Sequence, residues 1–229
     1  FSSRRRHTRC REVRGLGDVY KRQGLLCPSD WKAQWIGNRE DIFPDSTLTF
    51  PAPYFRKEFV VAKPIKKAMA YVCGLGFYEM YFNGERVGEQ VLAPAVTNYD
   101  RRSLKKLLYH YDDQSTQRVF YNVFDVTGNL KMQNNAIGII LGNGWYNQRD
   151  RTVEGHMWYD VPKMILQLEI EYEDGTKEMI VSDNSWKTTT GPLLHDAIFT
   201  GEIYDARKDL GHWNRESYDD NIWESALQV

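Results

Sequence analysis

The chain has 229 residues, with 30 basic and 31 acidic side chains and a formal net charge of −1 at pH 7. Hydrophobic residues make up 41% of it and aromatic residues 14%, which suits one large or two small domains with a sizeable core. No run approaches the roughly 18 consecutive apolar residues of a membrane span. The near-neutral charge lacks the excess of Lys and Arg typical of nucleic-acid-binding proteins. The composition therefore predicts no membrane span and no nucleic-acid partner.

The first 23 residues differ in composition from the rest of the chain. Residues 1–23 hold eight of the basic and two of the acidic side chains, so residues 24–229 carry 22 basic against 29 acidic groups. A basic arm can bind nucleic acid or direct targeting, but this one has no apolar stretch typical of a secretory signal. It also resembles translated sequencing-adapter sequence, and we expect it to be non-native. We then expect a linker or edge segment at 24–52 and a folded domain at 53–229.

Short alternating segments separated by turns predict β-structure along most of the folded domain. Strands are expected at residues 54–61, 68–73, 77–82, 118–124, 136–141, 164–172 and 178–181. Asn83-Gly84 is typical of a type I′ turn and predicts a hairpin between residues 77–82 and 85–88. Asp174-Gly175 predicts a second hairpin in the same way. The pattern indicates an all-β protein, an antiparallel β-sandwich that is jelly-roll-like and galactose-binding-like.

One segment departs from the strand pattern. Leu104, Leu107, Leu108 and Tyr111 are spaced as on one face of a helix, and Ser103 suits its N-cap. We expect a short helix inserted in the β-domain.

The three cysteines give no sign of a zinc site. Cys10, Cys27 and Cys73 show neither a CxxC motif nor a Cys/His spacing that suits zinc. Cys73 lies in an apolar strand pattern, so we expect a buried thiol.

Two motifs, LGNGWY at 141–146 and GEIYDAR at 201–207, set glycine beside aromatic and amide or carboxylate side chains. Flat apolar faces suit the C–H groups of a sugar, and a few fixed polar groups suit its hydroxyls. A further tryptophan lies in a polar loop at 156–160. The candidate carbohydrate-binding residues are Asn143, Trp145, Tyr146, Trp158, Glu202, Tyr204, Asp205 and Arg207.

A structural interpretation stays open for the same residues. Gly142 and Gly144 suit a bend of the backbone, and Trp145 can fill the core. The charges of GEIYDAR can form an Arg–carboxylate network that pins a loop or docks another domain, and this interpretation is favoured for them.

Calcium is the one cofactor that the sequence suggests. Asp100 and Asn143 carry oxygens of the kind that calcium binds, but the ion needs six to eight oxygen ligands. Two candidates do not make a site. Asp100 also suits the start of a turn or a helix cap.

Eight motifs occur in a fixed order along the chain. They are PYFRKEF at 53–59, GLGFYEMYFNGERVG at 74–88, LAPAVTNYDRR at 92–102, FDVT at 124–127, LGNGWY at 141–146, SDNSWK at 182–187, GEIYDAR at 201–207 and YDDNIW at 218–223. The series resembles the N-terminal β-sandwich of bacterial α-L-rhamnosidases over nearly all of residues 31–229. The segment at 103–117 looks longer than the common form of the family.

The resemblance implies an enzyme with several β-domains around an (α/α)₆ barrel, which carries the acidic catalytic residues and hydrolyses with inversion. The barrel lies C-terminal to the matched region, so no catalytic residue carries over. We expect a non-catalytic N-terminal fragment that supports the missing catalytic barrel of the same chain. A rhamnose-containing glycan or glycoside would be the substrate, and a periplasmic or secreted location is implied.

Two alternatives stay open. One is a stand-alone carbohydrate-binding module for L-rhamnose, with calcium as in some related rhamnose-binding domains. The other is a purely structural domain that packs on the barrel, and a sizeable exposed apolar patch would favour it.

Overall fold

The computed structural model describes residues 24–25, 27–38, 50–97, 99, 119–148 and 157–229. The chain divides into two compact units, Phe1–Lys32 and Ala33–Val229. The described part of the first unit contains the 3-10 turn η1 (Pro28–Asp30), in which the Asp30 carboxylate accepts a hydrogen bond from the Cys27 backbone nitrogen at 2.8 Å. The expected basic arm at 1–23 and the expected helix at 103–111 lie outside the described residues.

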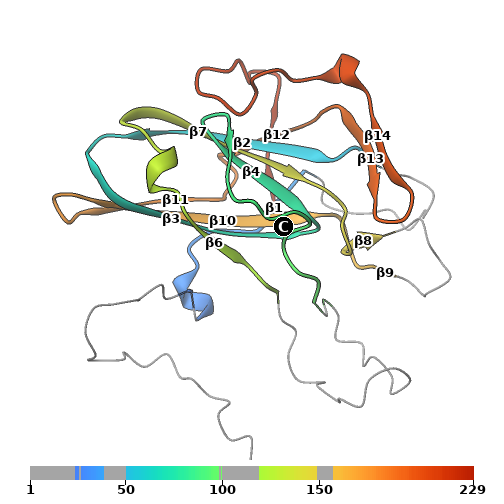
Figure 1. The fold of residues 1–229 in the computed structure, drawn as a ribbon, viewed down its shortest axis with the longest axis horizontal. Coiled ribbons are helices and arrows are strands. Elements are labelled where there is room, and N and C mark those ends of the chain that lie inside the picture. The colour runs from blue at the N-terminus through green and yellow to red at the C-terminus, as the bar shows by residue number, and fades with distance from the viewer. Residues whose placement is uncertain (1–23, 26, 39–49, 98, 100–118, 149–156) are drawn as a thin grey trace, which may run out of the picture. The chain divides into compact units, whose positions relative to one another are not determined.

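Two antiparallel sheets form the frame of the second unit. The first has the order β16 (Leu227–Gln228), β1 (Ile36–Gly37), β10 (Lys163–Tyr172), β3 (Ile65–Leu75) and β6 (Asn122–Asp125), and β11 (Lys177–Val181) also pairs with β10. The second has the order β15 (Glu224–Ser225), β12 (Lys187–Thr190), β2 (Pro53–Val61), β7 (Gln133–Leu141), β4 (Tyr78–Phe82) and β5 (Glu85–Arg86). Figure 1 shows the sheets as two stacked layers.

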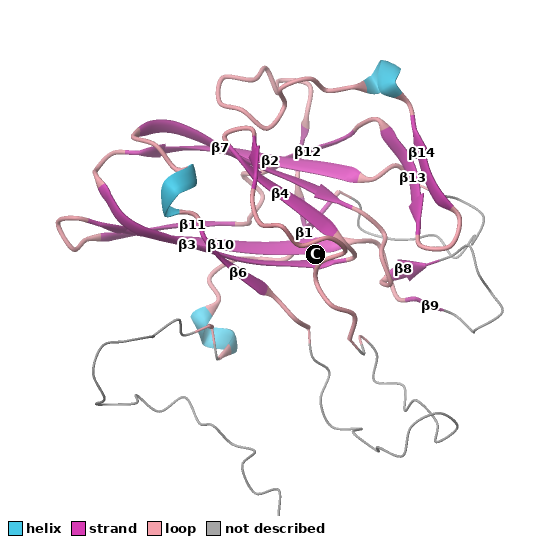
Figure 2. Cartoon of the chain, in the orientation of Figure 1, coloured by secondary structure: helices cyan, strands magenta, loops and turns pink. Residues whose placement is uncertain are grey.

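Two small ribbons lie at one end of these layers. One pairs β8 (Asn147–Gln148) with β9 (Met157–Trp158), and the other pairs β13 (Leu193–Ala197) with β14 (Gly201–Tyr204). Figure 2 shows the β13–β14 hairpin standing at the edge of the sandwich. The remaining described elements are the 3-10 turns η2 (Thr127–Asn129) and η3 (Ala206–Lys208). Over the described residues, no helix combines the length and hydropathy needed to cross a membrane.

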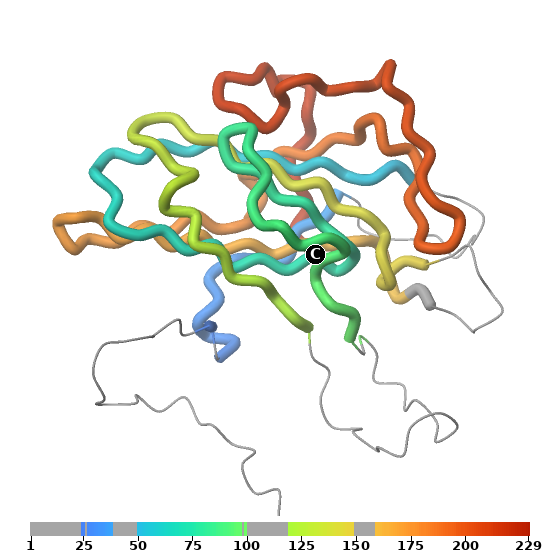
Figure 3. The backbone as a smooth tube through the Cα atoms, viewed as in Figure 1, coloured from blue at the N-terminus to red at the C-terminus, as the bar shows by residue number. Residues whose placement is uncertain are grey.

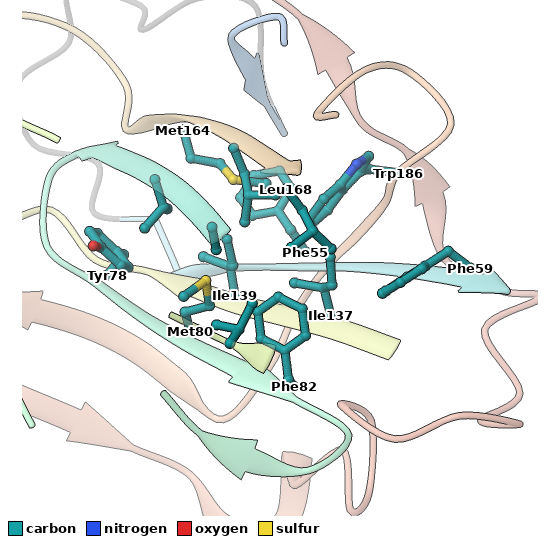
Figure 4. Close-up of a cluster of buried hydrophobic side chains, with 14 of the residues drawn as sticks. Phe55, Phe59, Tyr78, Met80, Phe82, Ile137, Ile139, Met164, Leu168 and Trp186 are labelled. Atoms are coloured by element: carbon teal, nitrogen blue, oxygen red, sulfur yellow. The ribbon is translucent and has the colours of Figure 1, made fainter. Parts of the chain in front are cut away.

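Alternation along the strands builds a single large core between the layers. On β2, Phe55 and Phe59 face inward and belong to one core cluster with Leu168 and Trp186 from other strands and turns (Figure 4). Trp186 is fully buried, and its indole nitrogen donates to the carbonyl oxygen of Val181 at 2.8 Å. Each fully buried large apolar side chain contributes about 1.5–3 kcal/mol, so this face accounts for much of the stability of the sandwich.

The structure confirms the main sequence predictions. Asn83 and Gly84 have φ values of 51° and 89°, which is the left-handed pair that a type I′ turn requires, and β4 pairs with β5 across them. Cys73 is 2% exposed, and burial raises the pKa of its thiol to about 12. The antiparallel β-sandwich is confirmed as well.

The outer face of the second sheet is covered by the segment that precedes β15, drawn in red in Figure 3. Trp213 from this segment packs edge-on against Tyr54 of β2, with ring centroids 5.0 Å apart, and stacks on Trp223 at 6.2 Å. Its ring lies over Gly138 of β7, where an added Cβ would come within 2.6 Å of it. The glycine therefore makes room for the tryptophan.

A buried arginine fastens the same segment. Arg56 of β2 is 1% exposed and donates to the carbonyl oxygens of Trp213 at 3.0 Å and Arg215 at 2.8 Å. It also pairs with the carboxylate of Asp220, to which Lys187 donates at 2.8 Å. Burial alone would raise the pKa of Asp220, but the hydrogen bonds from Lys187 and Arg56 outweigh it and lower that pKa.

Candidate functional site

The LGNGWY motif forms the turn after β7, where the backbone passes very close to the loop before β4. Gly142 donates its backbone N–H to the carbonyl oxygen of Phe77 at 2.7 Å. Gly144 has φ of 50°, and a Cβ there would lie 2.8 Å from the Phe77 nitrogen; a Cβ on Gly76 would lie 2.1 Å from the Gly142 oxygen. Gly76 and Gly144 are needed because two backbone segments touch at these positions.

Asn143 forms hydrogen bonds with other residues of the protein. Its backbone nitrogen donates to Oδ1 of Asp196 on β13 at 2.6 Å, and its Nδ2 donates to Oδ2 of the same carboxylate at 3.0 Å and to the Asp196 carbonyl oxygen at 3.1 Å. Its Oδ1 accepts from Nδ2 of Asn147 at 2.6 Å. Asn143 therefore ties the turn after β7 to the β13–β14 hairpin and to β8.

Asp196 is the ionisable group at the centre of this junction. Burial raises its pKa, and the hydrogen bonds from Asn143 oppose the rise without cancelling it. A carboxylate held this firmly by one asparagine acts as an anchor. Its neighbour across the ribbon, Glu202, is exposed.

Trp145 lies beside the hairpin as well. It is half-buried, and its ring meets Phe199 edge to face, with centroids 5.8 Å apart and an interplanar angle of 81°. Aromatic pairs in this geometry add about 0.5–1.5 kcal/mol beyond their buried area. The contact supports the hairpin turn from the side of the sandwich.

Tyr146 belongs to a cluster of three tyrosines. It is 8% exposed and stacks on Tyr159 at 5.7 Å, while Tyr99 meets Tyr146 edge-on at 5.2 Å and Tyr159 at 5.4 Å. Burial, helped by Asp160 and Tyr99, raises the pKa of Tyr146 to about 12. Tyr146 is therefore enclosed by two other tyrosine rings.

The charges of GEIYDAR lie within β14, at Glu202, and just beyond its end, at Asp205 and Arg207. Asp205 caps η3 and accepts two hydrogen bonds from the Arg207 guanidinium, at 2.8 and 2.9 Å. Hydrogen bonding to the Arg207 side chain lowers the pKa of Asp205. Glu202 and Tyr204 are exposed on β14. The Asp205–Arg207 pair therefore closes a local turn, while Glu202 and Tyr204 face outward.

The remaining candidates are Trp158 and Asp100. The backbone of Trp158 pairs with Asn147 across β8 and β9, and Asp100 lies outside the described residues. The described residues contain no group of three or more His, Cys, Asp or Glu side chains placed to hold a metal ion. The oxygen of Asn143 offered for calcium is the one that accepts from Asn147.

The sequence-predicted residues thus form two separate sets. The turn after β7 contacts the β13–β14 hairpin, whereas Asp205 and Arg207 pair with each other. The residues that join the motifs, Asp196 and Phe199, were not among the predicted ones. Both lie in a stretch without a glycine–aromatic motif, and only the pairing of β13 with β14 brings them to the turn after β7.

The fold and this site define an antiparallel β-sandwich whose motif residues chiefly join loops and a hairpin. Residues 63–112 and 111–229 match the family described as the alpha-L-rhamnosidase N-terminal domain. The chain belongs to this family and corresponds to the N-terminal, non-catalytic region of such enzymes.

Individual relatives agree with this family assignment. An alpha-L-rhamnosidase of Formosa agariphila is 35% identical over 92% of this chain, which matches 23% of that protein. The structure of alpha-L-rhamnosidase from Dictyoglumus thermophilum is 43% identical, with a TM-score of 0.73, over 90% of this chain and 22% of that one. An alpha-L-rhamnosidase from Aspergillus terreus is 33% identical, with a TM-score of 0.76 and the same coverage. The chain spans less than a quarter of the length of these relatives.

Proposed function

We propose that the chain is the N-terminal bracing domain of an α-L-rhamnosidase that releases L-rhamnose from glycans or glycosides. In this proposal the domain neither hydrolyses nor binds the sugar by itself. It supports the catalytic part of the enzyme, which supplies the acid and the base. One observation carries the proposal: the side chain of Asn143, the best candidate for a sugar contact, donates to Asp196 and accepts from Asn147.

The other candidate residues fit the same role. Tyr146 lies in a closed stack of tyrosines, and Asp205 holds Arg207. These contacts stabilise their own loops, while Asn143 and Trp145 hold the β13–β14 hairpin. A domain with a rigid frame is suited to bracing a neighbour, because an interface placed on it needs little ordering on association.

Domain replacement tests the bracing role. In the 43%-identical Dictyoglumus relative, the matching 22% of the protein is replaced by the present chain. Loss of rhamnosidase activity of this hybrid is then followed on heating. We expect the hybrid to keep a higher midpoint of heat inactivation than the same relative without any N-terminal domain. Equal midpoints for the hybrid and the shortened enzyme would contradict the bracing role. The isolated chain, assayed with an aryl α-L-rhamnoside, is expected to release no product.

A second candidate is sugar binding by the domain alone. It draws support from Trp145, which is only half-buried, and from Gln148, whose buried Nε2 finds no hydrogen-bond partner among the residues that the structure describes. It predicts that the isolated chain binds L-rhamnose, and that Trp145→Ala weakens the binding while the fold is retained.

A further inference from the structure

The β13–β14 hairpin is fixed to the sandwich and yet left uncovered on its outer side. Asp196 holds it to the turn after β7 through Asn143. The backbone nitrogen of Ile198 donates to Oε1 of Gln148, a residue that is 1% exposed, at 3.3 Å. All four residues of β14 are exposed, in contrast. The hairpin is therefore a firmly mounted element with an open side.

The exposed strand β14 is apolar where a solvated ribbon would be polar. Ile203 and Tyr204 are each 59% exposed and, as neighbours in a strand, present their side chains on opposite faces of the ribbon. Ile198 and Phe199 at the turn are 37% and 39% exposed. Single exposed apolar side chains are normal on a protein surface, and Ile222 is of that kind. Four within one hairpin form a group, and grouped apolar exposure marks an interaction site.

The backbone of β14 adds a second feature. Among the described residues β14 pairs with β13 alone, so its other edge presents unpaired N–H and C=O groups. An open, apolar strand edge is a template for association and is usually blunted by charge or covered. Glu202 is the single charged residue within β14. The hairpin thus offers both apolar side chains and backbone hydrogen bonds to a partner.

We propose that this hairpin, through Ile198, Phe199, Ile203 and Tyr204, is the surface on which the remainder of the parent α-L-rhamnosidase docks. The inference rests on the proposed function and names the surface that performs it. In the relatives that match 90% of this chain, the matched part is 22% of the protein, so a much larger folded partner is tethered to the domain. A tethered partner meets the hairpin at high effective concentration, which favours it over a second copy or a free sugar.

Footprinting in the hybrid enzyme tests the surface. Hydroxyl-radical labelling of Phe199, Ile203 and Tyr204 is compared between the isolated 229-residue chain and the hybrid that carries it. We expect labelling of these three residues to fall several-fold in the hybrid. Ile222, which is 91% exposed, serves as the matched reference and should label equally in both. Equal labelling of the hairpin residues in the two proteins would overturn the proposal.

Two substitutions separate the surface from the fold. Ile203→Asp is expected to lower the midpoint of heat inactivation of the hybrid and to leave the unfolding midpoint of the isolated chain unchanged, whereas Ile222→Asp should alter neither. If Ile203→Asp and Ile222→Asp give the hybrid the same midpoint of heat inactivation, the docking surface is refuted. This holds even if the hybrid is more heat-resistant than the shortened enzyme. If the hybrid with the unsubstituted hairpin is no more heat-resistant than the relative without an N-terminal domain, the bracing function itself is refuted. If the hairpin residues of the isolated chain already label weakly and the chain elutes as a dimer in size-exclusion chromatography, the partner on this surface is a second copy of the chain, and the proposal is overturned.

Discussion

Replacing Arg56 by methionine probes the fastening of the segment that precedes β15. The guanidinium donates to two backbone carbonyl oxygens, at 3.0 and 2.8 Å, and forms ion pairs with Glu58 and Asp220. Removing one partner of a buried ion pair costs about 3–5 kcal/mol. Asp220 is 21% exposed and keeps its contact with Lys187, which moderates the cost. We therefore expect Arg56→Met to lower the free energy of unfolding by about 3 kcal/mol, with the orphaned carbonyls supplying much of it.

Urea unfolding of the full chain, followed by tryptophan fluorescence, measures this loss. Trp213 and Trp223 lie in the covered cluster and report on the same region. Lys66→Met is the control, because Lys66 is 62% exposed and its ion pair with Glu171 lies in solvent; such pairs contribute little. A loss for Arg56→Met of under about 1 kcal/mol, which is typical of an average substitution, would refute the assigned role of the arginine.

Three further changes test the junction and its electrostatics. Asn143→Ala removes the side-chain hydrogen bonds to Asp196 and Asn147 but keeps the one from its backbone nitrogen, and it should lower the free energy of unfolding by about 1–3 kcal/mol, as measured in urea; no change would show that the side-chain bonds of the junction contribute nothing. Gly144→Ala places a Cβ at positive φ and 2.8 Å from a backbone nitrogen, so its thermal midpoint should fall well below that of Gly128→Ala, where no atom lies within 4 Å of the added Cβ; matching midpoints would contradict this. The pKa of Asp220 is lowered in the fold, so its ionised form stabilises the protein above the unfolded pKa of about 4, and this stability is lost as the pH falls through the folded pKa. Asp220→Asn should therefore flatten the acid side of a plot of thermal midpoint against pH, and an unchanged acid side would count against the ion pair.

Local sequence signals predicted the central strands because their pattern and their turns agree. Residues 54–61 alternate between the core and the outer face, and Asn83-Gly84 adopts the backbone of the expected turn. Each signal lies within a few residues, so it could be recognised without knowledge of the partners. The short strands β12, β15 and β16 lack such a signal, since their pairing depends on segments far away in the chain.

The site was harder to predict for the same reason. LGNGWY stood out because two glycines flank an asparagine, but a sugar contact and a backbone junction require similar residues. The distinction came from Asp196, which is 53 positions away and meets Asn143 only in the folded chain. Likewise, the arginine in PYFRKEF gave no sign that it would be buried beneath Trp213 and Arg215.

The central claim is that the motif residues hold the sandwich together and leave sugar binding to other parts of the enzyme. Titration calorimetry of the folded 229-residue chain with L-rhamnose, with and without calcium, tests it most directly. The account predicts no saturable heat under either condition. Saturable heat that Trp145→Ala abolishes, in a variant with an unchanged unfolding midpoint, would contradict the account and establish a carbohydrate-binding module.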